Sequence, residues 1–61
     1  MWIVVPVLCG GADQGITVPS REQGLIEADD ILNHWDDISF CYIEQWDDNS
    51  GMLIHREEIY K

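Results

Sequence analysis

The sequence predicts a single α+β domain in which a small antiparallel sheet of about three strands packs against one helix, in the order β-(β)-α-β-β. Three observations lead to this prediction. An apolar segment rich in Val and Ile opens the chain, a segment near the middle has helical periodicity, and two β-prone segments flank a turn near the end. A length of 61 residues leaves room for one domain, residues 1–61.

The first strand is predicted over residues 2–9, a continuous apolar run that is typical of a buried strand. Pro6 has no N–H group to donate to a neighbouring strand, so we expect this strand to lie at a sheet edge or to bulge at Pro6. Residues 10–15 form a glycine-containing loop, and residues 16–18 are expected to add a short extended segment.

A helix is predicted to begin near Ser20, because Ser20 followed by Gln23 fits a capping box. Gly24 weakens that helix start by about 1 kcal/mol. At 100° per residue, one apolar stripe is expected to be buried, and it consists of Leu25, Ala28, Ile31, Leu32 and Trp35. Ile26 falls among the acidic residues on the other side, and the projection does not explain it.

Residues 38–46 and 52–60 are predicted to form a hairpin around the turn 47–51. Both faces of this hairpin carry apolar side chains, since Phe40 and Tyr42 alternate with Cys41 and Ile43. One helix cannot cover both faces. The uncovered face is therefore expected to be an interface, either with a partner protein or with a second copy in a homodimer.

The net charge of −9, from 12 acidic against 3 basic residues, excludes several functions. Nucleic-acid binding depends on Lys and Arg neutralising phosphates, so no direct binding of nucleic acid is expected. Adsorption to an anionic membrane is disfavoured for the same reason, and no membrane partner is expected. The length also excludes a TIM barrel and a complete dinucleotide-binding domain. We expect a basic partner protein.

Cysteine use and the first segment indicate a cytoplasmic protein. Two cysteines, Cys9 and Cys41, are fewer than disulfide-rich secreted domains carry, so both thiols are expected to be free. The apolar segment 1–9 lacks the basic leader of a signal peptide. It is also much shorter than the roughly 20 residues that span a bilayer.

An acidic helix face is the strongest functional feature. Five carboxylates are expected along roughly 22 Å, about one per 4.5 Å, compared with about one phosphate per 3.4 Å along a DNA strand. They are Glu22, Asp29, Asp30, Asp36 and Asp37, and Glu27, Glu44, Asp47 and Asp48 could extend the surface. Trp46, beside two acids, is a candidate aromatic anchor.

The alternative interpretation of these residues is an ordinary solvated helix face. Two details count against it. No Lys or Arg occurs between Glu22 and His55, although soluble surfaces normally mix charge signs. Asp36 and Asp37 are also expected near the helix C-terminus, where each negative charge is unfavourable by about 0.3–1 kcal/mol.

Neither catalysis nor metal binding is predicted. Read as a calcium loop from Asp47, the chain has Met52 where the loop needs glycine. His34 and Cys41, with nearby acids and Ser39, are residue types found in nucleophilic triads, but 61 residues leave little room for a water-excluding pocket. No enzyme, no cofactor and no metal site is expected.

Small, strongly acidic one-domain chains without catalytic motifs resemble phage-encoded DNA mimics, including anti-CRISPR and anti-restriction inhibitors. The resemblance is compositional and comes from the acids between Glu22 and Asp37, the Asp47-Asp48 turn and the overall charge. It implies an inhibitor that occupies the cationic DNA-binding surface of a bacterial defence complex, with a CRISPR effector or a nuclease as the target. Two alternatives stay open: an immunity protein or antitoxin against a basic nuclease toxin, and a structural or dimerisation module.

Overall fold

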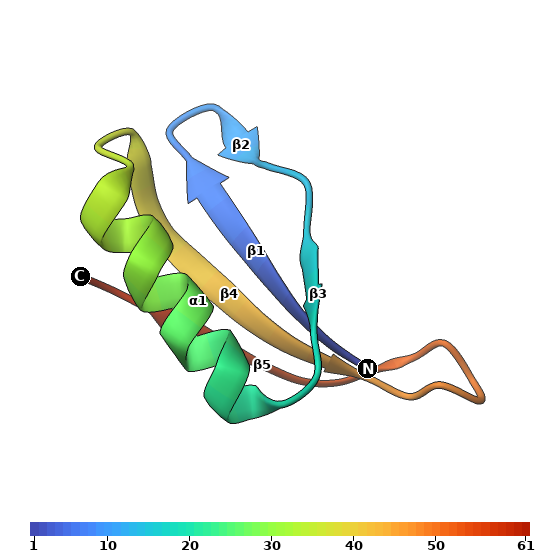
Figure 1. Cartoon of the computed structure of the whole chain (residues 1–61). Coiled ribbons are helices and arrows are strands. Elements are labelled where there is room, and N and C mark those ends of the chain that lie inside the picture. The colour runs from blue at the N-terminus through green and yellow to red at the C-terminus, as the bar shows by residue number, and fades with distance from the viewer.

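The computed structural model describes all 61 residues and places one helix against one side of a five-stranded antiparallel sheet (Figure 1). The elements, in chain order, are β1 (Trp2–Leu8), β2 (Gly11–Ala12), β3 (Ile16–Val18), α1 (Arg21–His34), β4 (Ile38–Trp46) and β5 (Leu53–Ile59). The predicted α+β class, with one helix and a C-terminal hairpin, is confirmed. Strand β3 matches the short extended segment that was expected over residues 16–18, and the two-residue strand β2 was not expected.

The position of β1 differs from the prediction. The sheet order is β2-β1-β4-β5, and β3 also pairs with β1, so β1 lies inside the sheet rather than at its edge. Pro6 faces the interval between β2 and β3, where its carbonyl accepts a hydrogen bond of 2.8 Å from the Asp13 amide. The N–H and C=O groups of one strand residue point to the same side. The N–H that proline lacks would therefore have pointed into the gap between β2 and β3, where no strand needs it as a donor. A central strand therefore tolerates proline here.

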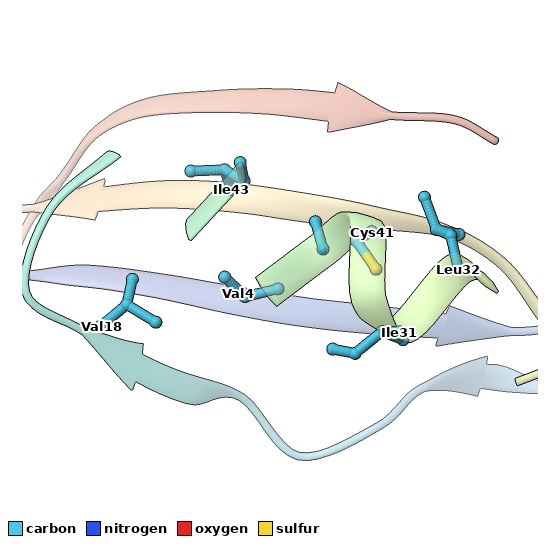
Figure 2. Close-up of a cluster of buried hydrophobic side chains, with 7 residues drawn as sticks. Val4, Val18, Ile31, Leu32, Cys41 and Ile43 are labelled. Atoms are coloured by element: carbon cyan, nitrogen blue, oxygen red, sulfur yellow. The ribbon is translucent and has the colours of Figure 1, made fainter. Parts of the chain in front are cut away.

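The core lies between α1 and the side of the sheet that faces it (Figure 2). Its buried members are Val4, Val18, Ala28, Ile31, Leu32, Cys41 and Ile43. Antiparallel pairing places Val4 opposite Ile43, so the two central strands present these side chains together to the helix. Leu25 packs against the edge of this cluster, so four members of the predicted helix stripe contact the core.

Trp35, the fifth member of that stripe, is the exception. The helix ends at His34, and Trp35 is an extended cap with φ −118° and ψ 109°. Its amide donates to the Ile31 carbonyl at 2.9 Å, but its side chain leaves the helical projection and is 60% exposed. The prediction of a buried Trp35 is therefore wrong.

The start of α1 agrees with the capping signal, since the Ser20 hydroxyl accepts a hydrogen bond of 3.2 Å from the Gln23 amide. Gly24 is buried in the first turns. A Cβ atom there would lie 3.4 Å from Val18, 3.5 Å from Val4 and 3.6 Å from Ile43, which are ordinary packing distances. The glycine is not required by its backbone conformation, because its φ is not positive.

We therefore expect Gly24→Ala to stabilise the domain by about 0.5–1 kcal/mol, because alanine restores helix propensity and fills space without a clash. Urea unfolding followed by circular dichroism measures this change. A loss of stability would contradict the packing described around Gly24.

The side of the sheet that faces away from α1 has no covering element (Figure 1). We call it the open face, and strand alternation assigns to it Ile3, Val5, Val7, Phe40, Tyr42 and Tyr60. The ring of Phe40 lies 5.1 Å from that of Tyr42, edge to face, and 5.1 Å from that of Tyr60, stacked. As expected, one helix leaves an aromatic face uncovered. No helix has the length and apolar character needed to cross a bilayer.

Candidate functional site

The outward side of α1 carries four of the predicted acids, which we call the helix acids: Glu22, Glu27, Asp29 and Asp30. Glu22, Asp29 and Asp30 are exposed, while Glu27 is half-buried at the flank of the helix. Ile26 is 61% exposed among them, so this face combines carboxylates with one exposed apolar side chain. None of the four carboxylates pairs with Lys or Arg.

His34 is the only basic side chain that lies within ion-pair distance of a helix acid. Its Nδ1 atom lies 3.2 Å from Asp30 Oδ1 and 2.8 Å from the Asp30 carbonyl oxygen. This contact neutralises charge only when the imidazole is protonated. Apart from this contact, no ion pair within the chain involves the helix acids.

The structure places Asp36 and Asp37 beyond the helix rather than on its surface. Both are exposed in the turn between α1 and β4. The predicted acidic helix face from Glu22 to Asp37 is too long, because the extended backbone at Trp35 ends the helical spacing. We call Asp36 and Asp37 the turn acids.

Glu44 does not extend the acidic surface, which corrects the prediction. It lies on the same side of the sheet as the open face and is 6% exposed. Its Oε2 accepts a hydrogen bond of 2.9 Å from Arg56 Nε and lies 2.8 Å from Arg56 Nη2 in an ion pair. The Trp46 indole N–H donates to Glu44 Oε1 at 3.1 Å. Trp46 is half-buried beside Glu44. Its role as an aromatic anchor beside Asp47 and Asp48 stays a prediction.

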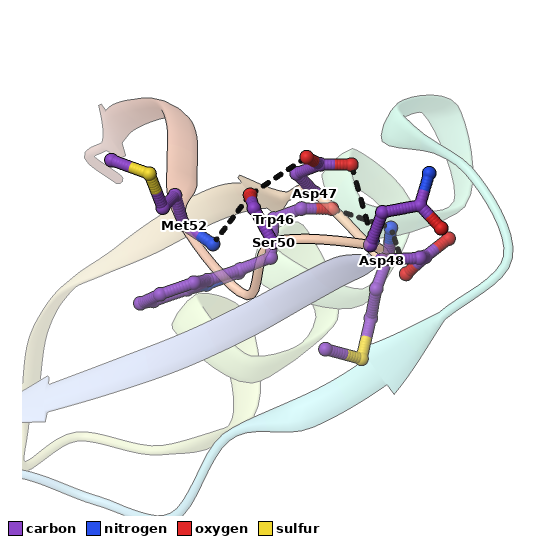
Figure 3. Close-up of polar contacts among 7 residues, drawn as sticks. Trp46, Asp47, Asp48, Ser50 and Met52 are labelled. Carbon is purple, nitrogen blue, oxygen red and sulfur yellow. Dashed lines mark hydrogen bonds and ion pairs between the residues drawn. The ribbon is translucent and has the colours of Figure 1, made fainter.

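The two acids of the β4–β5 loop shape that loop (Figure 3). Asp47 Oδ2 accepts a hydrogen bond of 2.7 Å from the Ser50 hydroxyl, and Oδ1 accepts one of 3.3 Å from the Asn49 amide. These hydrogen bonds lower the pKa of Asp47 below its ordinary value, and the bond from Ser50 has a larger effect than the bond from Asn49. Asp48 lies 3.1 Å from the amino group of Met1. These acids lie apart from the helix acids and have structural partners.

An ion pair between α1 and β5 was not predicted from the sequence. The guanidinium of Arg21 binds Glu57 through two hydrogen bonds, Nη2 to Oε1 at 2.8 Å and Nε to Oε2 at 3.0 Å. His55 Nε2 also lies 2.8 Å from Glu57 Oε2. The partners are 36 residues apart, so no spacing pattern could have revealed them. The Arg21 hydrogen bond, followed by that of His55, lowers the pKa of Glu57.

The placement of the cations explains why the acidic surface is unpaired. Both arginines bind glutamates on the sheet, Glu57 and Glu44, and Lys61 takes part in no ion pair. Of the 12 carboxylates, ten therefore have no Lys or Arg partner. The unpaired charge is concentrated on the helix, on the turn after it and in the loops.

The lowered pKa of Glu57 predicts a pH-dependent contribution to stability. That contribution is fully present above the ordinary pKa of a glutamate and is lost as the pH falls through the lowered pKa, where Glu57 becomes protonated. We expect Glu57→Gln to be less stable than wild type at pH 7 and equally stable near pH 2. Urea unfolding at both pH values measures this, and a difference that persists in acid would contradict the ion-pair explanation.

No three His, Cys, Asp or Glu side chains come together in a way that could hold a metal ion. Comparisons with protein-family models, with curated proteins and with solved structures found no match to this chain. The chemistry of the chain's own surface therefore has to support any functional proposal.

Proposed function

We propose that this protein is an acidic inhibitor that mimics DNA and occupies the cationic DNA-binding surface of a bacterial defence complex. The observation that supports this most strongly is the unpaired state of the helix acids. Arg21 belongs to the same helix, yet its guanidinium binds Glu57 on β5 rather than Glu22 beside it. The cations of the chain leave this face negative.

The spacing of the helix acids suits a surface that normally binds a phosphate backbone. Glu22 and Asp30 are eight residues apart, or about 12 Å along the axis at 1.5 Å per residue. Four carboxylates over this length give about one charge per 3–4 Å, close to the 3.4 Å spacing of phosphates along one DNA strand. Carboxylates would pair with Lys and bidentately with Arg in the target.

The same surface has an energetic cost to the protein that carries it. Like charges repel within a domain of 61 residues, which has a small core and a small stability margin. Retaining that repulsion suggests that binding, rather than stability, accounts for the charge. Complementary charge would also steer fast association with a basic partner.

A CRISPR effector is the target class that we propose, with the inhibitor encoded by a phage and acting in the host cytoplasm. An immunity protein that blocks a basic nuclease toxin would use the same helix acids against a different target. The two are distinguished by which basic protein binds, so the experiment uses both classes of target.

The deciding experiment is competition with DNA. Purified protein is added to CRISPR effectors of several types and to basic nuclease toxins, before and after a fluorescent target duplex, and anisotropy reports bound DNA. A DNA mimic is expected to block loading when it is added first, and its affinity should fall steeply between about 50 and 200 mM salt. Binding that leaves DNA loading unchanged, or binding that is insensitive to salt, would contradict mimicry.

A dimerisation module is the second candidate, and the open face favours it. Two copies with a net charge of −9 repel each other, so they could approach only where charge is neutralised. On the open face, Glu44 is paired with Arg56, and Phe40 lies between Tyr42 and Tyr60. Sedimentation of wild type and Phe40→Ser tests this candidate: a dimer that Phe40→Ser dissociates supports it, and a monomer at all concentrations excludes it.

A further inference from the structure

A cavity of about 180 Å³ lies at the C-terminal end of α1, between its last turn, β1 and the segment that joins β2 to β3. Its apolar walls come from Pro6, Leu8, Ile31 and Ile38, and its rim includes Trp35, Asp13 and Asp37. The volume is below the roughly 300–1,000 Å³ of pockets that hold drug-sized ligands. It suits one long side chain.

Local hydrogen bonds hold both sides of the rim in place. The Asp13 amide donates to the Pro6 carbonyl at 2.8 Å, and Asp13 Oδ1 accepts from the Gln14 amide at 2.7 Å. On the other side, the Trp35 amide donates to Ile31 at 2.9 Å. The position of the rim is thus set by backbone contacts on both sides.

The rim is negative and has no cation of its own. Neither Asp13 nor Asp37 forms an ion pair within the chain. The cavity also borders the C-terminal turn of α1, where the helix dipole favours a positive charge. Trp35, 60% exposed, adds an indole ring on which a cation can stack.

We infer that this cavity receives an arginine side chain of the partner protein. The apolar stem of the side chain would lie against the walls while its charged head reaches the rim. Arginine fits better than lysine because a planar guanidinium can stack on the indole and also bind carboxylates through two N–H groups. The inference rests on the proposed function because it assumes that the partner is basic. It adds one specific contact to the binding by the helix acids.

The test uses short peptides, so it does not depend on the identity of the target. The ¹⁵N-labelled protein is titrated with the blocked tripeptides Gly-Arg-Gly, Gly-Lys-Gly and Gly-citrulline-Gly, of which the last has the shape of the first without its charge. With Gly-Arg-Gly, we expect saturable shifts of the Trp35 indole N–H and of the Gln14 and Ile38 amides. Gly-Lys-Gly should bind several-fold more weakly, and the citrulline peptide should cause no saturable shift.

Variants distinguish binding of the peptide in the cavity from its general attraction to an acidic protein. Asp37→Asn is expected to weaken Gly-Arg-Gly binding by about 3–10-fold, whereas the control Glu58→Gln, which removes an exposed charge from β5, should leave it unchanged. Trp35→Ala should abolish the saturable shifts, and its circular dichroism spectrum checks that it folds. If it does not fold, the Asp37 and Glu58 variants decide.

Two results would overturn the inference: equal binding of the arginine and citrulline peptides, or equal weakening by Asp37→Asn and Glu58→Gln. The peptide test contains no target protein. If it fails, the arginine site is rejected, but the proposed competition with DNA through the helix acids is not. Conversely, peptide binding without DNA competition would reject the proposed function and keep the arginine site.

Discussion

Neutralising the four helix acids is expected to abolish competition with DNA and, at the same time, to raise the thermal stability of the domain. The variant carries Glu22→Gln, Glu27→Gln, Asp29→Asn and Asp30→Asn. Four ion pairs of about 0.5–1 kcal/mol each correspond to a loss of target affinity of roughly 100-fold. The salt dependence of binding should flatten as well, because fewer charged contacts form. Anisotropy competition and thermal unfolding measure the two effects.

A matched pair of double variants controls for overall charge. Asp29→Asn with Asp30→Asn removes two charges from α1, and Asp48→Asn with Glu58→Gln removes two exposed charges from the hairpin. Only the first pair is expected to weaken binding. Equal weakening by both pairs would show that net charge alone matters, and full binding by the fourfold variant would reject the helix acids as the interface.

Replacing Arg56 by alanine is expected to destabilise the domain by about 2–3 kcal/mol, because the Glu44 carboxylate would lose its charged partner. The Glu44 residue is 6% exposed, and the indole N–H of Trp46 would be the only remaining side-chain donor to its carboxylate. The substitution also removes the guanidinium that lies 4.8 Å from the centre of the Tyr42 ring. Urea unfolding monitored by tryptophan fluorescence measures the loss.

Removing both partners provides the control. The double variant Glu44→Met with Arg56→Met leaves no unpaired charge, so we expect it to recover most of the lost stability. Arg56→Lys keeps the charge but loses the planar guanidinium, whose Nε and Nη2 both lie near Glu44 Oε2. Its stability should therefore lie between those of wild type and Arg56→Ala. A loss below about 0.5 kcal/mol for Arg56→Ala would mean that water reaches Glu44 despite its burial.

The helix and the hairpin could be predicted because their apolar spacing repeats over enough residues. Ala28, Ile31 and Leu32 define a helical stripe, and the alternation around Cys41 and Ile43 defines a strand. Strand β2, with two residues, is too short to show any periodicity. For β3 the sequence indicated an extended segment but not its pairing with β1. The helix end was misplaced because neither glycine nor proline follows His34, so nothing in the sequence marked the change of backbone at Trp35.

The exposed acids of α1 were predictable because a helical projection separates its buried and solvent sides. The burial of Glu44 was not predictable, because both faces of β4 carry apolar residues and alternation alone does not tell which side the helix covers. Its pairing with Arg56 also depends on the hairpin register, which shifts between Gln45 and Trp46. The cavity between Asp13 and Asp37 depends on how the segment after β1 folds back, which no local pattern encodes.

The two thiols differ in a way that is useful for labelling. Cys9 is exposed beside the β1–β2 turn, whereas Cys41 is wholly buried and burial raises the pKa of its thiol. The thiolate is the nucleophile that adds to a maleimide, so wild-type protein should take up one dye, at Cys9, without any cysteine being replaced. The same asymmetry means that air oxidation would link two molecules through Cys9, so sizing measurements require a reductant.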